Sequence, residues 1–249
     1  MSALETANVH DEVRAGPIVL ACVSGFLAGQ IIAALLVALV VSLTHFTGGL
    51  ASLTKLGSPP WWSNGLSLMG LWIGFGLAIV YARKSGNLKD WPGQWRFYPR
   101  DVLYIVLGVA LQGLVGLAYR PFHLRNLNRP VHHLFGSAHG PTFLLLAVMT
   151  SLGAPIIEEW FFRGVLFRAL QSGFKVRWAR SSTWAAVLVS ASLFGAAHGE
   201  PLQFAGLAFL GVVVAIVTDR TKRLIPSMLT HASFNAVAMV SLILQRSSH

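Results

Sequence analysis

The sequence predicts an all-α fold, a polytopic bundle of about seven transmembrane helices with the N-terminus inside the cell. Of the 249 residues, 54% are hydrophobic and 11% are charged, whereas a soluble domain carries about 25% charged residues. The hydrophobic residues also gather in runs that are long enough to cross a bilayer, which takes about 20 residues in a helix. The chain therefore requires lipid as its solvent, and the bilayer is its first expected partner.

Seven apolar runs are candidate spans, and together they account for most of the chain. They lie at residues 18–43, 65–82, 102–119, 142–170, 183–198, 203–218 and 224–244. The first run is longer than the core of a signal peptide and lacks a small-residue cleavage site, so we expect it to stay in the membrane. Gly70, Gly74 and Gly76 stand in the second run, where small residues let helices approach closely. Pro155 in the fourth run predicts either a kink or a junction between two helical pieces.

The Lys and Arg residues are divided unequally between the two ends of these runs. With the N-terminus inside, 14 of the 19 fall in cytoplasmic segments and 5 in outer segments, as cytoplasmic loops require. The same clusters account for the net charge of +10 without forming one basic face, so no nucleic-acid partner is expected. No repeat or linker divides the chain, which predicts a single membrane domain over residues 1–249. The short chain without targeting features predicts a bacterial inner membrane.

Ionisable side chains interrupt the fourth run, where each is expensive, about 2.5–3.5 kcal/mol at the centre of a span. Glu159 and Arg163 are four residues apart with the acid first, so on a helix they face each other and can pair. Glu158 points about 100° away from Glu159, because a helix has 3.6 residues per turn. The spacing therefore predicts one neutralised carboxylate beside one that stays available for acid–base chemistry.

Polar residues also stand in two later runs. His198 ends the fifth run, and His231 and Asn235 share one helical face near the start of the last run. Each of these features alone is compatible with a structural role, such as an interhelical hydrogen bond worth about 0.6–2 kcal/mol. Three separate spans that all carry such residues predict a shared functional site.

Straight spans of full length would not bring these residues to one depth. At 1.5 Å per residue, His198 would lie near the outer side and His231 about 10 Å from the inner interface. The residues meet only if helices tilt, if the hairpin that contains 203–218 is partly submerged, or if a cavity reaches deep into the bilayer. We give the joint motif precedence over the predicted boundaries of the spans, because boundaries are the less reliable inference.

Three short motifs follow one another in a fixed order within apolar segments. They are Glu158-Glu159-x-x-x-Arg163, Phe194-x-x-x-His198 and His231-x-x-x-Asn235. In this order they resemble the CAAX protease and bacteriocin-processing family of membrane proteins, also called the Abi family, which includes the type II CAAX prenyl endopeptidases. The resemblance covers about residues 142–241, which we take as the catalytic core.

The resemblance implies an intramembrane glutamic endopeptidase that uses neither a metal nor another cofactor. It implies that Glu158 activates the attacking water with the assistance of His198. It further implies that His231 and Asn235 stabilise the oxyanion, while the second acid and the arginine of the first motif hold Glu158 in position. A membrane-anchored peptide or protein is the expected substrate, and whether prenylated substrates are used stays open.

Two alternatives remain beside this interpretation. A zinc-dependent membrane protease would take His198, His231 and a glutamate as metal ligands, although the chain has no His-Glu-x-x-His motif and Asn235 is a poor zinc ligand. A non-catalytic immunity or chaperone protein of the same family would keep the fold without the reaction, because a fold does not fix a function. A transporter is disfavoured, since the two halves carry no paired broken helices.

Overall fold

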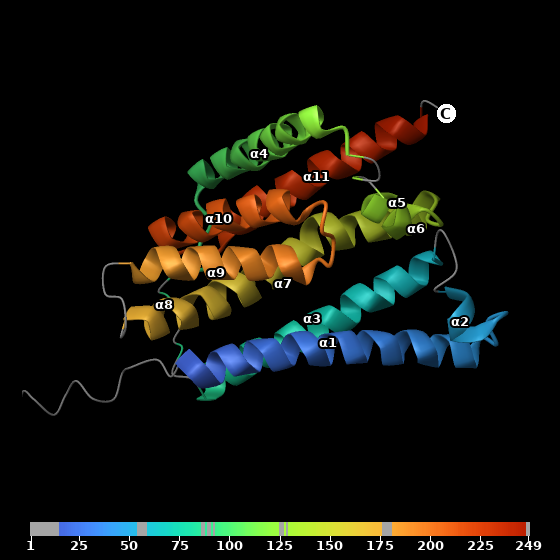
Figure 1. Cartoon of the computed structure of the whole chain (residues 1–249), viewed down its shortest axis with the longest axis horizontal. Helices are drawn as coiled ribbons and strands as arrows, with labels where there is room; N and C mark the ends of the chain where they lie inside the picture. The colour runs from blue at the N-terminus through green and yellow to red at the C-terminus, as the bar shows by residue number, and fades with distance from the viewer. Residues whose placement is uncertain are drawn as a thin grey trace, which may run out of the picture.

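The computed structural model describes residues 15–53, 59–85, 88, 91, 93–124, 127, 129–175 and 181–247. Every regular element in these ranges is a helix, so the predicted all-α fold is confirmed (Figure 1). The α-helices are α1 (Ala15–Leu43), α2 (Gly49–Leu53), α3 (Trp61–Ser85), α4 (Leu103–Tyr119), α5 (Arg129–Phe135), α6 (Gly140–Val148), α7 (Ala154–Glu159), α8 (Arg168–Lys175), α9 (Ser182–Ala197), α10 (Phe204–Thr221) and α11 (Ile225–Ser247).

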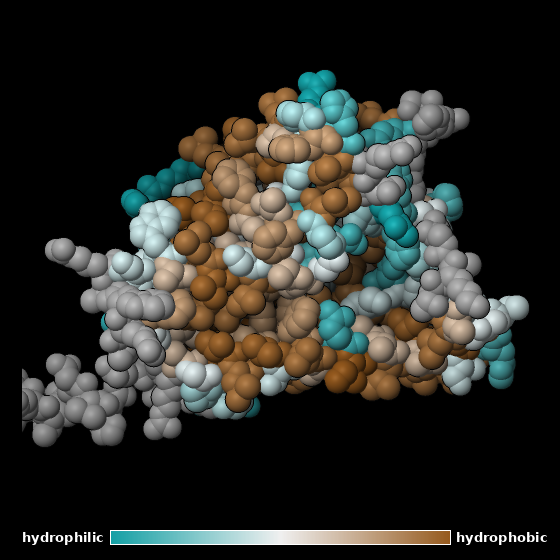
Figure 2. All heavy atoms as spheres, viewed as in Figure 1, coloured by the Kyte–Doolittle hydropathy of each residue, from teal (hydrophilic) through white to brown (hydrophobic). Residues whose placement is uncertain are grey.

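Six stretches in the described part of the chain are long and apolar enough to cross a membrane. They are Ala15–Leu43, Trp61–Lys84, Pro99–Phe122, Gly140–Lys175, Phe204–Thr221 and Ile225–Gln245. A seventh apolar helix, Ser182–Ala197, is shorter, which agrees with the predicted total of about seven. Large apolar side chains cover much of the outside of the bundle (Figure 2). The chain is an integral membrane protein, and these side chains face lipid.

Helices α1 and α3 pack closely because glycines line their contact. A Cβ atom on Gly25 would lie 2.7 Å from the Cβ atom of Ala78, and one on Gly74 would overlap the backbone of Gly29. Gly70 likewise leaves room only for the backbone of α1, so the predicted packing roles of Gly70 and Gly74 are confirmed. The prediction for Gly76 is wrong, because a Cβ atom there would meet nothing within 4 Å.

The helix that begins at Gly140 runs without a break to Lys175 and contains two π-helical segments, Met149–Gly153 and Trp160–Phe167. Pro155 lies just after the first of these segments and does not divide the helix into two pieces. A proline removes one backbone donor and crowds the preceding turn. The wider π turn before it accommodates the proline inside a continuous helix, and π segments occur frequently at functional sites.

A buried ion pair joins the start of α11 to the start of α4. Both terminal nitrogens of Arg223 donate to the carboxylate of Asp101, and one of them also donates to the Arg96 carbonyl at 3.0 Å. Asp101 in turn accepts a hydrogen bond from the backbone N–H of Tyr98 at 2.9 Å. A bidentate pair of this kind fixes orientation as well as distance. It sets the register of α11, which carries two of the predicted site residues.

Candidate active site

A cavity of about 490 Å³ lies among α3, α4, α5, the long helix and α11. Three of the six predicted site residues line it, namely Glu158, His198 and Asn235. The other three lie behind its wall and are almost fully buried, with relative exposures of 0% for Glu159, 0% for Arg163 and 1% for His231. The structure thus brings the six residues together and divides them into a pocket group and a buried group.

The predicted depth conflict is resolved by the short α9–α10 hairpin. Helix α9 has 16 residues, and in Figure 1 its turn to α10 lies short of the ends of α1 and α11. His198, the residue that follows α9, therefore lies part of the way along the bundle and not at its end. The cavity extends inward from this level to Glu158.

Two side chains, Arg163 and His231, hold the carboxylate of Glu159 in place. Its Oε1 accepts a hydrogen bond from Nη1 of Arg163 at 3.0 Å, which is the pairing that the spacing predicted, and another contact joins it to Nδ1 of His231 at 2.9 Å. Since a carboxylate only accepts, Nδ1 of His231 carries the proton. Arg163 also donates from Nη2 to the Gly211 carbonyl of α10 at 3.2 Å. This buried network ties the long helix to α10 and α11.

The Phe194 ring separates the buried group from His198. It is fully buried, and the guanidinium carbon of Arg163 lies 4.4 Å from its centroid. The ring centroids of His198 and His231 lie 4.9 and 5.3 Å from that of Phe194, both in edge-on arrangements. A cation over an aromatic face is stabilised by the ring quadrupole, more so when water is excluded. The Phe194 ring thereby orients both imidazoles and covers the arginine.

Glu158 points away from the Glu159 network, as its helical position requires. Its Oε2 lies 3.9 Å from Nε2 of His231, beyond hydrogen-bond length, and has no hydrogen-bond partner among the described residues. Glu158 thus lines the cavity while its Oε2 is buried on the side of His231. An acid beside a cavity that is not fixed in an ion pair can take a proton from a bound molecule.

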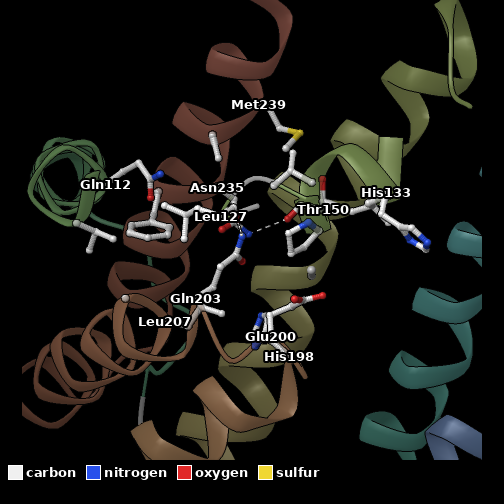
Figure 3. Close-up of a pocket in the computed structure, with 18 of the residues that line it drawn as sticks. Gln112, Leu127, His133, Thr150, His198, Glu200, Gln203, Leu207, Asn235 and Met239 are labelled. Carbon is white, nitrogen blue, oxygen red and sulfur yellow. Dashed lines mark hydrogen bonds between the residues drawn. The ribbon is translucent and has the colours of Figure 1, made fainter. Parts of the chain in front are cut away.

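His198 presents a lone pair to the cavity. Its Nδ1 lies 2.9 Å from the Phe194 carbonyl, and because a carbonyl only accepts, Nδ1 is the protonated nitrogen. The Nε2 atom of the neutral ring is then an acceptor. His198 is exposed at the cavity, and Figure 3 shows it on the same side of the cavity as Glu200.

The side chain of Asn235 donates to a backbone carbonyl that has no donor within the long helix. The N–H of Ala154 donates to the Met149 carbonyl, five residues back, and is therefore not available to the Thr150 carbonyl. The next residue in the π pattern is Pro155, which has no N–H. The side-chain amide of Asn235 donates to the Thr150 carbonyl at 3.0 Å instead (Figure 3). An amide nitrogen has two N–H groups, so the second one remains for a ligand.

Several further polar residues of the cavity were not among those predicted, and Gln112 and Thr150 are two of them. Gln112 of α4 lines the wall opposite α6 and α7, and its Oε1 has no hydrogen-bond partner among the described residues. Thr150 contributes the carbonyl that Asn235 binds. The sequence contained a signal for Gln112, since it is an amide within the apolar run 102–119. No sequence signal identified the Thr150 carbonyl, because backbone groups are common to every residue.

In the parts of the chain that the structure describes, no three His, Cys, Asp or Glu side chains are grouped so that they could hold a metal ion. The zinc alternative needs His198, His231 and one glutamate around a common point. Here His231 faces Glu158 and Glu159 from behind the wall, and His198 lies on the other side of Phe194. The arrangement therefore gives the zinc alternative no support.

Comparison with known proteins agrees with the ordered motifs. Residues 134–237 match the model of the family described as "Type II CAAX prenyl endopeptidase Rce1-like", and all three motifs fall within this segment. An uncharacterised 24.3 kDa protein of Escherichia coli is 26% identical over 188 residues, which cover 72% of this chain and 78% of that protein. No solved structure matches the chain. The match confirms the family that the motifs predicted, and it covers residues 134–237 of this membrane protein.

Proposed function

We propose that this protein is an intramembrane endopeptidase in which Glu158 activates water to hydrolyse a peptide bond of a membrane-associated substrate. The observation that carries the proposal is the division of the two adjacent acids. Glu159 is committed to Arg163 and His231, whereas Glu158 lines the cavity and its buried Oε2 has no hydrogen-bond partner among the described residues. A family of membrane proteases matches the same segment.

The positions of the cavity groups support the following reaction. A water held between Glu158 and Nε2 of His198 gives a proton to Glu158, and its oxygen attacks the substrate carbonyl carbon. The free N–H of Asn235 donates to the oxyanion that forms, a contribution worth about 2.7–4 kcal/mol for a well-placed donor. The C–N bond then breaks as Glu158 returns the proton to the leaving amine. The products are a new carboxyl end and a new amino end.

His231 supports this site from behind the cavity wall, where it is almost fully buried. Its Nδ1–H donates to Glu159 at 2.9 Å, while its Nε2 lies 3.9 Å from Oε2 of Glu158. Asn235 lines the cavity and is the donor to the oxyanion in this scheme. Arg163 pairs with Glu159 and keeps that side chain in place.

The non-catalytic alternative makes a different use of the same bundle. An immunity or chaperone protein needs the fold and a binding surface but no unpaired base in a cavity. The location of the protein in a bacterial inner membrane belongs to the proposal as well, in line with the similar protein of Escherichia coli. The two functions are separated by a substitution that removes the base and keeps its shape.

Glu158→Gln is that substitution, and Asp219→Asn is its matched control, because it makes the same chemical change beside Lys222 at the other end of the bundle. New amino termini of membrane-associated peptides and proteins are mapped by mass spectrometry in cells that carry each variant. We expect a set of termini that depends on the wild-type protein, that disappears in Glu158→Gln and His198→Ala, and that persists in Asp219→Asn. Hydrolysis in H₂¹⁸O will add one ¹⁸O atom to the matching carboxyl end. If Glu158→Gln, present at normal levels, produces the wild-type set, the protease proposal fails.

A further inference from the structure

The cavity lies toward one end of the bundle, as its lining residues indicate. They include Asn64 near the start of α3, Tyr119 at the end of α4, His133 in α5, and Glu200 and Gln203 in the α9–α10 turn. The start of α3 and α5 lie at the end of the bundle where α1 finishes, and the end of α4 and the α9–α10 turn lie part of the way toward it (Figure 1). Figure 2 shows a hollow in the viewed face near this end.

The opposite end of the bundle carries exposed Lys and Arg residues, as the cytoplasmic side of a membrane protein does. Exposed basic side chains stand where α3, α8 and α10 finish, and these are Arg83, Lys84, Lys175 and Arg220. Cytoplasmic loops are enriched in Lys and Arg. The end that holds these residues is therefore the cytoplasmic end, and the cavity lies toward the other side of the membrane.

The charges in the cavity restrict what can enter it. Its described lining residues include the acids Glu158 and Glu200 and no Lys or Arg. A carboxylate-terminated tail would meet these acids without a cationic partner, which is unfavourable in a site shielded from water. Amide side chains on the wall, from Gln112, Gln203 and Asn235, offer hydrogen bonds to an uncharged backbone instead.

We propose that the cavity receives its substrate from the non-cytoplasmic side, and that this substrate is an internal, uncharged or basic segment of a membrane-anchored peptide exposed on that side. The part that concerns the substrate rests on the proposed function, while the direction in which the cavity opens does not. A prenylated protein tail in the cytoplasm would lie on the wrong side of the membrane for this site.

Thiol accessibility tests the direction without any substrate. Cys22, the one cysteine of the sequence, is replaced by alanine, and single cysteines are introduced by Ala238→Cys, Val240→Cys and Arg220→Cys. Ala238 lines the cavity, whereas Val240, two residues along α11, is 54% exposed on the apolar outside. A charged, membrane-impermeant thiol reagent reacts with the thiolate, which forms in water and not in lipid.

In intact cells we expect labelling of Ala238→Cys, at least tenfold faster than that of Val240→Cys, and labelling of Arg220→Cys only after permeabilisation. Labelling of Arg220→Cys in intact cells would overturn the proposal, as would an Ala238→Cys that reacts only after permeabilisation or not at all. These readouts are independent of cleavage. A protein that labels as expected but produces no Glu158-dependent termini would therefore refute the proposed function and leave the direction of opening established.

Discussion

The hydrogen bond from Asn235 to the Thr150 carbonyl leads to a quantitative prediction for Asn235→Leu. Leucine has a similar size but no donor, so the Thr150 carbonyl is left without a partner because Pro155 cannot supply an N–H. Interhelical hydrogen bonds in membranes contribute about 0.6 kcal/mol on average and reach about 1.7 kcal/mol. The Thr150 carbonyl has no alternative donor in its helix, so we expect a loss of about 1–1.5 kcal/mol in the free energy of unfolding.

A double-mutant cycle with Pro155→Ala isolates the physical cause. Alanine at 155 restores a backbone N–H at the position from which the π pattern reaches the Thr150 carbonyl. In that background, Asn235→Leu should cause a smaller loss in the free energy of unfolding. We expect a coupling energy between the two substitutions of about 0.5–1 kcal/mol, whereas independent sites deviate from additivity by no more than about 0.3–0.5 kcal/mol. The measurement is equilibrium unfolding of the purified protein in mixed micelles with increasing sodium dodecyl sulfate.

Val240→Ala is the control for this cycle, because Val240 lies on the same helix and faces outward, and it should combine additively with Pro155→Ala. If the effects of Asn235→Leu and Pro155→Ala are additive, the reasoning is refuted. The missing N–H of Pro155 would then not be the reason why the Thr150 carbonyl needs the Asn235 amide. Proteolytic activity provides a second readout. It should stay lost in the Asn235→Leu, Pro155→Ala double variant even where stability returns, because the second N–H of Asn235 is absent.

Two further predictions concern the packing that supports the site. Gly74→Val should lower the free energy of unfolding by about 1–3 kcal/mol through overpacking against Gly29, whereas Gly76→Val, which faces open space, should stay within about 0.5 kcal/mol of wild type in the same assay. Arg163→Met should cost about 3–5 kcal/mol, because it leaves the Glu159 carboxylate buried beside His231 alone, and adding Glu159→Gln should recover most of the loss. A stable single Arg163→Met variant would show that Arg163 does not neutralise Glu159.

The fold class was predictable because lipid imposes a simple rule on sequence. Spans must be helical and apolar for about 20 residues, so the number of long runs gave nearly the correct set of helices. Packing detail was less accessible, as Gly76 shows: α3 is apolar on all sides, and its sequence does not distinguish the side that meets α1 from the side that meets lipid. The π segments around Pro155 were equally hidden, because they depend on a partner for the Thr150 carbonyl that lies 85 residues away.

The sequence predicted residues that the structure brings together, but it predicted only part of their geometry. The i, i+4 spacing correctly predicted the pairing of Glu159 with Arg163. It could not predict that His231 would bind the same carboxylate, since that contact depends on the angle between α11 and the long helix. The separation of the pocket group from the buried group depends on the Phe194 ring, whose position no local spacing determines.

The opposite surroundings of the two adjacent acids follow from their places on one helix. Successive side chains on a helix differ by about 100° in direction. Because Glu159 faces Arg163 of its own helix and His231 of α11, Glu158 must point elsewhere, and here it lines the cavity. One network can therefore hold Glu159 by hydrogen bonds while making none to Oε2 of Glu158. This separation assigns different consequences to two conservative changes. Glu158→Gln removes a group that faces the cavity and should reduce turnover with little loss of stability. Glu159→Gln removes the charge that Arg163 and His231 compensate and should reduce stability first.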